Sequence, residues 1–249
     1  MMKNIRNIAA SLTANLMANL TTKNVFAFIL VFLSWGVAKS ANAALPSAKV
    51  SVVYFGTATA ADFESKIKPV FQQNVSNCKS CELVNFTPYK DDGKVDMEAL
   101  QAKIEAVPAD MKLIFFDFNV KANDHNKALI EALNKKASAG TVVVAAAGAP
   151  PSTESSSPLS RTVFGQVHDA VIIGELGERE RLQPTGFYGP EMLTAIRPPK
   201  ETGEGYSAMI FVANLAENWP KRSPQDWVEH FKNKKMKSRK LWMGLNDLF

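Results

Sequence analysis

Apolar and amphipathic stretches alternate along most of the chain beyond residue 48. Several short segments rich in β-branched and other apolar residues have the length of strands: residues 49–55, 82–86, 112–118, 142–147 and 170–174. The segments between them carry apolar residues at helical spacing: 62–75, 95–107 and 126–139. This alternation predicts an α/β fold with a doubly wound, mostly parallel sheet and helices on both faces.

The helical spacing also predicts which side chains face inward. In the first helix they are Phe63, Ile67, Val70 and Phe71. In the second they are Met97, Leu100, Ile104 and Val107. In the third they are Ala128, Leu129, Ala132, Leu133 and Ala137.

The segment 142–147 is the most informative strand. It has no polar alternation, which is typical of a strand buried on both faces of a parallel sheet. Gly140 precedes it where the third helix should end, and Gly148 closes it. Loops at the carboxyl ends of such strands are where open α/β sheets place their sites, so the loop at Ala149 is a candidate site.

The second half is less regular in composition. Residues 186–199 contain three prolines and two glycines, which predicts an irregular segment. Residues 207–219 are apolar on nearly every side and predict a buried helix. Ser223 and Pro224 then have the residue types of an N-cap and a first helical position.

The N-terminus has the pattern of a secretory signal peptide. Basic residues precede an apolar run at residues 25–37, and Ala41 and Ala43 occupy the small-residue positions of a cleavage site. We therefore expect a signal peptide at 1–43, an α/β domain at 44–222 and a C-terminal helix with a basic tail at 223–249. Retention of the apolar run as an N-terminal anchor is the alternative.

The charge of the chain resides mostly in this leader. The formal net charge is +5, and removal of residues 1–43 takes away four basic residues and no acid, which leaves +1. This charge gives no reason to expect a nucleic-acid partner. We expect an exported protein, periplasmic or extracellular, with no stable membrane span after cleavage.

Cys78 and Cys81 are the only cysteines, and in an oxidising compartment we expect them to form a disulfide. A dithiol redox site is the alternative, although such motifs follow a strand and open a helix, whereas this one follows a helix and precedes a strand. A zinc site would need two further ligands, and the three histidines are not spaced to supply them. We expect no cofactor and no metal.

The helix, the glycine and the strand that ends in Ala146, Ala147 and Gly148 resemble the corresponding segment of the subtilisin-like serine peptidases. That family has an Ala-Ala-Gly-Asn signature here, and its asparagine donates to the oxyanion. Further landmarks follow in the family's order at 158–174, 187–190, 195–199 and 205–213, so the resemblance covers roughly residues 49–219. It implies a subtilisin-like fold.

The positions that carry catalysis in the family depart from its pattern. The oxyanion asparagine is replaced by Ala149, and the aspartate that ends the first strand falls on Tyr54 or Phe55. The helix that should open with a histidine signature contains no histidine. The nucleophile falls on Ser207 or Tyr206, depending on the register, and Ser207 is also a good N-cap.

Three functional hypotheses follow. The first is an exported subtilisin-like domain without its catalytic triad that binds a peptide or a protein. The second is a serine hydrolase with a relocated base, in which Ser207 works with His168 or Asp117. The third is a thiol-redox protein that uses Cys78 and Cys81.

Overall fold

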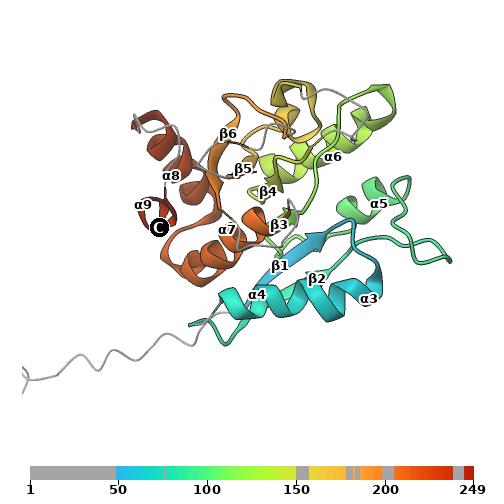
Figure 1. Cartoon of the computed structure of the whole chain (residues 1–249), viewed down its shortest axis with the longest axis horizontal. Coiled ribbons are helices and arrows are strands. Elements are labelled where there is room, and N and C mark those ends of the chain that lie inside the picture. The colour runs from blue at the N-terminus through green and yellow to red at the C-terminus, as the bar shows by residue number, and fades with distance from the viewer. Residues whose placement is uncertain are drawn as a thin grey trace, which may run out of the picture. The chain divides into compact units, whose positions relative to one another are not determined.

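The computed structural model describes residues 49–249 except for 76, 150–156, 178–181, 183–185, 198–204 and 238–243. The predicted signal peptide and cleavage site lie outside the described residues. Parallel strands form one sheet in the order β2-β1-β3-β4-β5-β6 (Figure 1). The strands are β1 (Val50–Phe55), β2 (Cys81–Asn85), β3 (Leu113–Phe116), β4 (Val142–Ala146), β5 (Val171–Glu175) and β6 (Met192–Ile196). The predicted parallel α/β sheet is confirmed.

Helices connect β1 to β2, β2 to β3 and β3 to β4. The chain from β1 to β2 passes through a continuous helical segment: α3 (Ala60–Asp62), a π-helical stretch (Phe63–Ile67) and α4 (Lys68–Asn74). The later helices are α5 (Leu100–Glu105), α6 (Lys127–Ser138), α7 (Gly205–Asn218), α8 (Pro224–Lys237) and α9 (Leu245–Leu248). Short 3₁₀ turns lie at Asp124–Asn126, Leu159–Arg161, Phe164–Gln166 and Trp219–Lys221.

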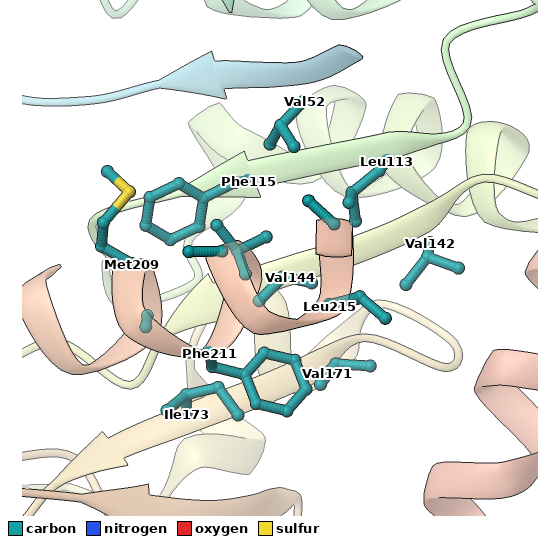
Figure 2. Packing of buried hydrophobic residues seen from close by; sticks show 14 of the residues in the cluster. Val52, Leu113, Phe115, Val142, Val144, Val171, Ile173, Met209, Phe211 and Leu215 are labelled. Carbon is teal, nitrogen blue, oxygen red and sulfur yellow. The ribbon is translucent and has the colours of Figure 1, made fainter. Parts of the chain in front are cut away.

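The sheet buries an apolar layer on each face because successive strand residues point to opposite sides. On one face, side chains such as Val52, Phe115 and Val144 pack against α4, α7 and α8 (Figure 2). On the other face, their sequence neighbours pack against α5 and α6. Helix α7 lies in the middle of the first face, where Phe211 and Leu215 are fully buried. This accounts for its apolar residues on nearly every side.

Two sequence predictions for these elements are wrong. The segment 186–199 is not irregular throughout, since it contains β6, a fully buried strand that pairs with β5. The second helix begins at Leu100 rather than residue 95, because the Asp96 carboxylate accepts the N–H groups of Glu98 and Ala99 in the turn that precedes it. Met97 therefore does not face the core and is 45% exposed.

Other local predictions agree with the structure. Gly140 has a positive φ of 81° at the turn between α6 and β4, a conformation that glycine adopts without strain. The Ser223 hydroxyl accepts the N–H of Asp226 at the start of α8, as an N-cap should. Leu129, Ala132 and Leu133 of α6 are buried, whereas Ala128 is exposed against prediction.

Candidate functional site

A groove of about 670 Å³ lies at the carboxyl ends of the central strands. Strand β1 pairs with β2 on one side and with β3 on the other, so the winding direction of the sheet reverses between β1 and β3. Open α/β sheets place their ligands at this switch point. The groove is lined by Thr57, Ala58, Ile67, Val70, Met97, Asp117, Phe118, Asn119, Val120, Gly148, Ala149, Gly205, Tyr206 and Met209.

A tyrosine–aspartate pair lies at the base of this groove. Tyr54 is fully buried near the end of β1, and its hydroxyl donates to Asp117 Oδ2 across 2.5 Å. The Asp117 side chain is partly exposed, and its Oδ1 accepts the N–H of Thr57 at 3.0 Å. Burial raises the pKa of Asp117 to about 6, although both hydrogen bonds act in the opposite direction. Burial, followed by the charge of Asp117, raises the pKa of Tyr54, so the phenol stays protonated.

Two glycines make room for the pair. A Cβ at Gly56 would lie 1.8 Å from the Tyr54 hydroxyl and 2.7 Å from Asp117 Oδ2. A Cβ at Gly205, the first residue of α7, would lie 2.8 Å from Asp117 Cβ. The pair therefore depends on close backbone approach from both the β1 loop and the start of α7.

The other buried polar side chain of the groove is already satisfied. Asn119 donates through Nδ2 to the Thr162 hydroxyl at 3.0 Å. Its Oδ1 accepts the N–H of Val120 at 2.9 Å and that of Phe164 at 3.4 Å. These contacts fix the loop after β3, and they leave Asp117 as the charged side chain that faces the groove among the described residues.

The structure separates the two candidates for the nucleophile position. Tyr206 lines the groove, but Ser207 does not. Ser207 is fully buried as the third residue of α7, and its hydroxyl donates to the carbonyl of Ile196 at 2.9 Å. The expectation that Ser207 is the N-cap of this helix is therefore wrong. The hydroxyl holds the helix to the end of β6 instead.

None of the histidines lines the groove. His168 lies just before β5, at the amino-terminal edge of the sheet and therefore opposite the groove. Its backbone N–H donates to Oδ1 of Asn134. His125 is exposed in a 3₁₀ turn, and the His230 ring pairs with the carbonyl of Leu248. Among the described residues, no hydrogen bond joins Ser207 to His168 or to Asp117, because the Ser207 hydroxyl donates to the carbonyl of Ile196.

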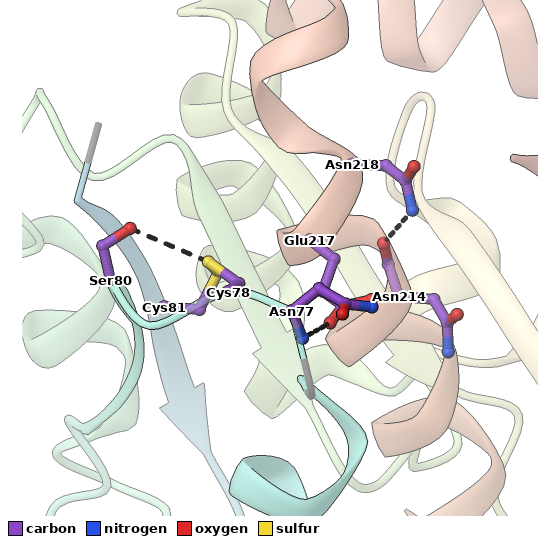
Figure 3. Close-up of a disulfide and its surroundings, with 7 residues drawn as sticks. All are labelled: Asn77, Cys78, Ser80, Cys81, Asn214, Glu217 and Asn218. Atoms are coloured by element: carbon purple, nitrogen blue, oxygen red, sulfur yellow. Dashed lines mark hydrogen bonds between the residues drawn. A yellow bond between two sulfur atoms is a disulfide. The ribbon is translucent and has the colours of Figure 1, made fainter. Parts of the chain in front are cut away.

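Cys78 and Cys81 form a disulfide at the start of β2, whose first residue is Cys81 (Figure 3). Because the sheet is parallel, this position is at the amino-terminal edge, opposite the groove. Nearby, the N–H of Asn77 donates to the carboxylate of Glu217 at 2.6 Å, which connects the turn to the end of α7. The pair is thus separate from the candidate site.

Ala149 lies in the groove, and its methyl group cannot donate a hydrogen bond. Among the described residues, no cluster of three or more histidine, cysteine, aspartate or glutamate side chains could hold a metal ion. Within the same residues, no helix is long and apolar enough to cross a membrane.

Sequence reasoning named Asp117 as a candidate but missed its contact with Tyr54, and it also missed the place of Met97 in the groove. Asp117 is the only charged residue in the apolar segment 112–118 apart from Lys112 at its start, which was a signal for a buried or functional carboxylate. Its contact with Tyr54, however, joins residues on two different strands. Met97 was assigned to the core, and its place in the groove could not be seen without the turn that precedes α5.

Comparison with known proteins gives the fold. No family model matches the chain, and no curated protein sequence matches it. A cold-adapted subtilisin-like serine proteinase matches with a TM-score of 0.55 and 10% identity, over 74% of this chain and 81% of that one. A lanthipeptide protease matches with a TM-score of 0.55 and 11% identity, over 79% and 84% of the two chains.

A protease from Pseudoalteromonas arctica matches with a TM-score of 0.50 and 14% identity, over 66% of this chain and 58% of that one. At such identities the likeness extends to the fold alone. The fold is subtilisin-like, in agreement with the resemblance seen in the sequence.

Proposed function

We propose that this chain is an exported subtilisin-like domain that binds a peptide, or an extended segment of a protein, in its groove without cleaving it. The observation that carries the proposal is a large groove at the switch point whose base holds Tyr54 and Asp117 instead of a nucleophile with a base. Ligand sites are typically concave and mostly apolar with a few well-placed polar groups, and the lining of this groove has that character.

The described groove lacks the parts that acyl transfer needs. Ser207 is buried and donates to a backbone carbonyl, and no described histidine can take its proton. A hydroxyl without a base is a weak nucleophile near neutral pH. Ala149 also supplies no oxyanion donor, and the loss of one such donor costs about 100- to 1000-fold in rate. We do not multiply these rate losses, because the effects of losing several residues of one catalytic unit are not additive.

We predict that the purified protein cleaves no peptide bond. Turnover should be measured on a mixed peptide library with the parent, Ser207→Ala and Ala149→Asn, and all three should be inactive while melting cooperatively. Ala149→Asn should not restore activity, because an oxyanion donor has no effect where no activated nucleophile forms the tetrahedral intermediate. Serine-dependent cleavage, or labelling of Ser207 by a fluorophosphonate, would instead establish the hydrolase hypothesis.

Binding in the groove is tested with a variant that fills it. Ala58 is partly exposed and lines the groove, so Ala58→Trp should weaken the binding of library peptides measured by fluorescence anisotropy. The matched control is Ala102→Trp, which adds the same side chain to an exposed position on α5 outside the groove. Equal binding by both variants would contradict a groove-bound ligand.

A further inference from the structure

The groove combines one carboxylate with apolar walls. Asp117 is the only charged side chain among the described residues that line it. Ile67 and Val70 from the helical segment after β1, together with Met97 and Met209, form apolar walls. We propose that the groove selects peptide segments in which a lysine or arginine is flanked by apolar residues, and that Asp117 binds the cationic group. This inference rests on the proposed function.

Asp117 has acceptor capacity to spare. An ionised carboxylate offers about four lone-pair sites. The hydroxyl of Tyr54 and the N–H of Thr57 occupy one site on each oxygen. Both donors are neutral, and none of the ion pairs found among the described residues includes Asp117. A cation that enters the groove can therefore complete the coordination of this carboxylate.

The surroundings of Asp117 favour the binding of such a cation. A partly buried carboxylate without a counter-charge is costly to ionise, as the rise of its pKa shows. A cation that reaches it in a groove with apolar walls interacts more strongly than it would in bulk water. Asp117 is also held in place by the close approach of Gly56 and Gly205. Little side-chain conformational entropy is therefore lost at this residue when a ligand binds.

The apolar walls favour flanking apolar residues in the ligand. Met97 and Tyr188 are the large hydrophobic side chains that the described part of the chain exposes most. Met97 lies in the groove, so a bound apolar side chain would remove it from water. Methionine side chains adapt to differently shaped partners. With Met97 and Met209 on its walls, the groove should accept various aliphatic residues beside the cation, while Asp117 supplies the selectivity.

The test compares two short capped peptides, one with a central lysine flanked by leucine and valine and the other with norleucine in place of the lysine. Binding to the full mature chain is measured by calorimetry. The parent should bind the lysine peptide roughly 10- to 100-fold more tightly, the range expected for a partly desolvated charge pair. Asp117→Asn keeps the size of the side chain and should abolish this preference.

The matched control is Asp110→Asn, which removes the same charge from an exposed loop before β3, and it should keep the preference. If the parent binds both peptides alike, or if Asp117→Asn still prefers lysine, the inference is overturned while the proposed function stands. If neither peptide binds to any variant, the proposed function falls as well. The two-peptide comparison on the parent remains decisive even if Asp117→Asn folds poorly.

Discussion

Asp117 occupies an unusual position for an acidic residue, between a buried tyrosine and the first residue of a central helix. Its two hydrogen bonds stabilise the ionised form, yet burial outweighs them and raises its pKa to about 6. The side chains that influence the titration of this pair are tyrosines: Tyr54 donates to Asp117 and stays protonated, and Tyr89, in the loop after β2, also raises the pKa of Tyr54. The ionisation of one side chain should therefore be visible in the stability of the whole domain.

We predict that Asp117 makes the folded state less stable as the pH rises from about 4 to about 6. The carboxyl group titrates near 3.8 when unfolded and near 6 when folded, so between these values the unfolded state releases the proton first. A shift of about two units corresponds to about 3 kcal/mol at most. Urea unfolding at several pH values should show this slope in the parent and in Asp110→Asn, but not in Asp117→Asn. A parent-like slope in Asp117→Asn would contradict the assignment.

At this scale the sequence predicted residue types better than contacts. It placed Ala149 in the loop after a buried strand and Tyr54 near the end of the first strand, as the structure has them. It could not show that Tyr54 and Asp117 meet, because the contact joins β1 to the end of β3 and is fixed by the register Tyr54↔Phe115. It also assigned Ser207 to a cap, since an N-cap serine and a serine in the first helical turn look alike in sequence.

Among the elements, strands and helices with strong periodicity were predictable, and those defined by tertiary contacts were not. Helix α6 and strand β4 follow the pattern closely because glycine marks the turn between them. Strand β6 was missed because prolines and glycines surround its short apolar core. It is a strand because β5 supplies its hydrogen bonds and α7 covers it, so tertiary context overrides local composition.

We predict that the disulfide stabilises the turn between α4 and β2 without affecting the groove. The double variant Cys78→Ala/Cys81→Ala should lower the free energy of unfolding by about 2 kcal/mol, since the bond closes only a short loop. Lys79→Ala, an exposed substitution inside the same loop, is the control. Peptide binding should be unchanged in both, because the disulfide lies at the opposite edge of the sheet. Turnover of a thiol substrate by the parent would support the redox hypothesis instead.

For the whole molecule, the subtilisin-like fold accounts for the position of the groove. The order β2-β1-β3-β4-β5-β6 places the reversal between β1 and β3, so the chain leaves the carboxyl ends of these two strands in opposite directions. The groove thus follows from the winding of the sheet, whereas catalysis depends on a few side chains on its rim. The sequence could predict the first from periodicity, but the chemistry of the second depended on individual positions.

We predict that the mature protein begins at Ala44 after export. The apolar run at residues 25–37 is shorter than the roughly 20 residues that span a bilayer comfortably, and small residues at Ala41 and Ala43 suit signal-peptide cleavage. Mass spectrometry of protein isolated from its native compartment should find Ala44 at the N-terminus, with Cys78 and Cys81 inaccessible to alkylation before reduction.

Ala43→Leu should block cleavage and leave the precursor with the membrane fraction, whereas Ser47→Leu, beyond the cleavage site, should be processed normally. An intact Met1 or Met2 on the native protein would instead support the N-terminal anchor, and free thiols trapped directly from cells would argue against an oxidising compartment.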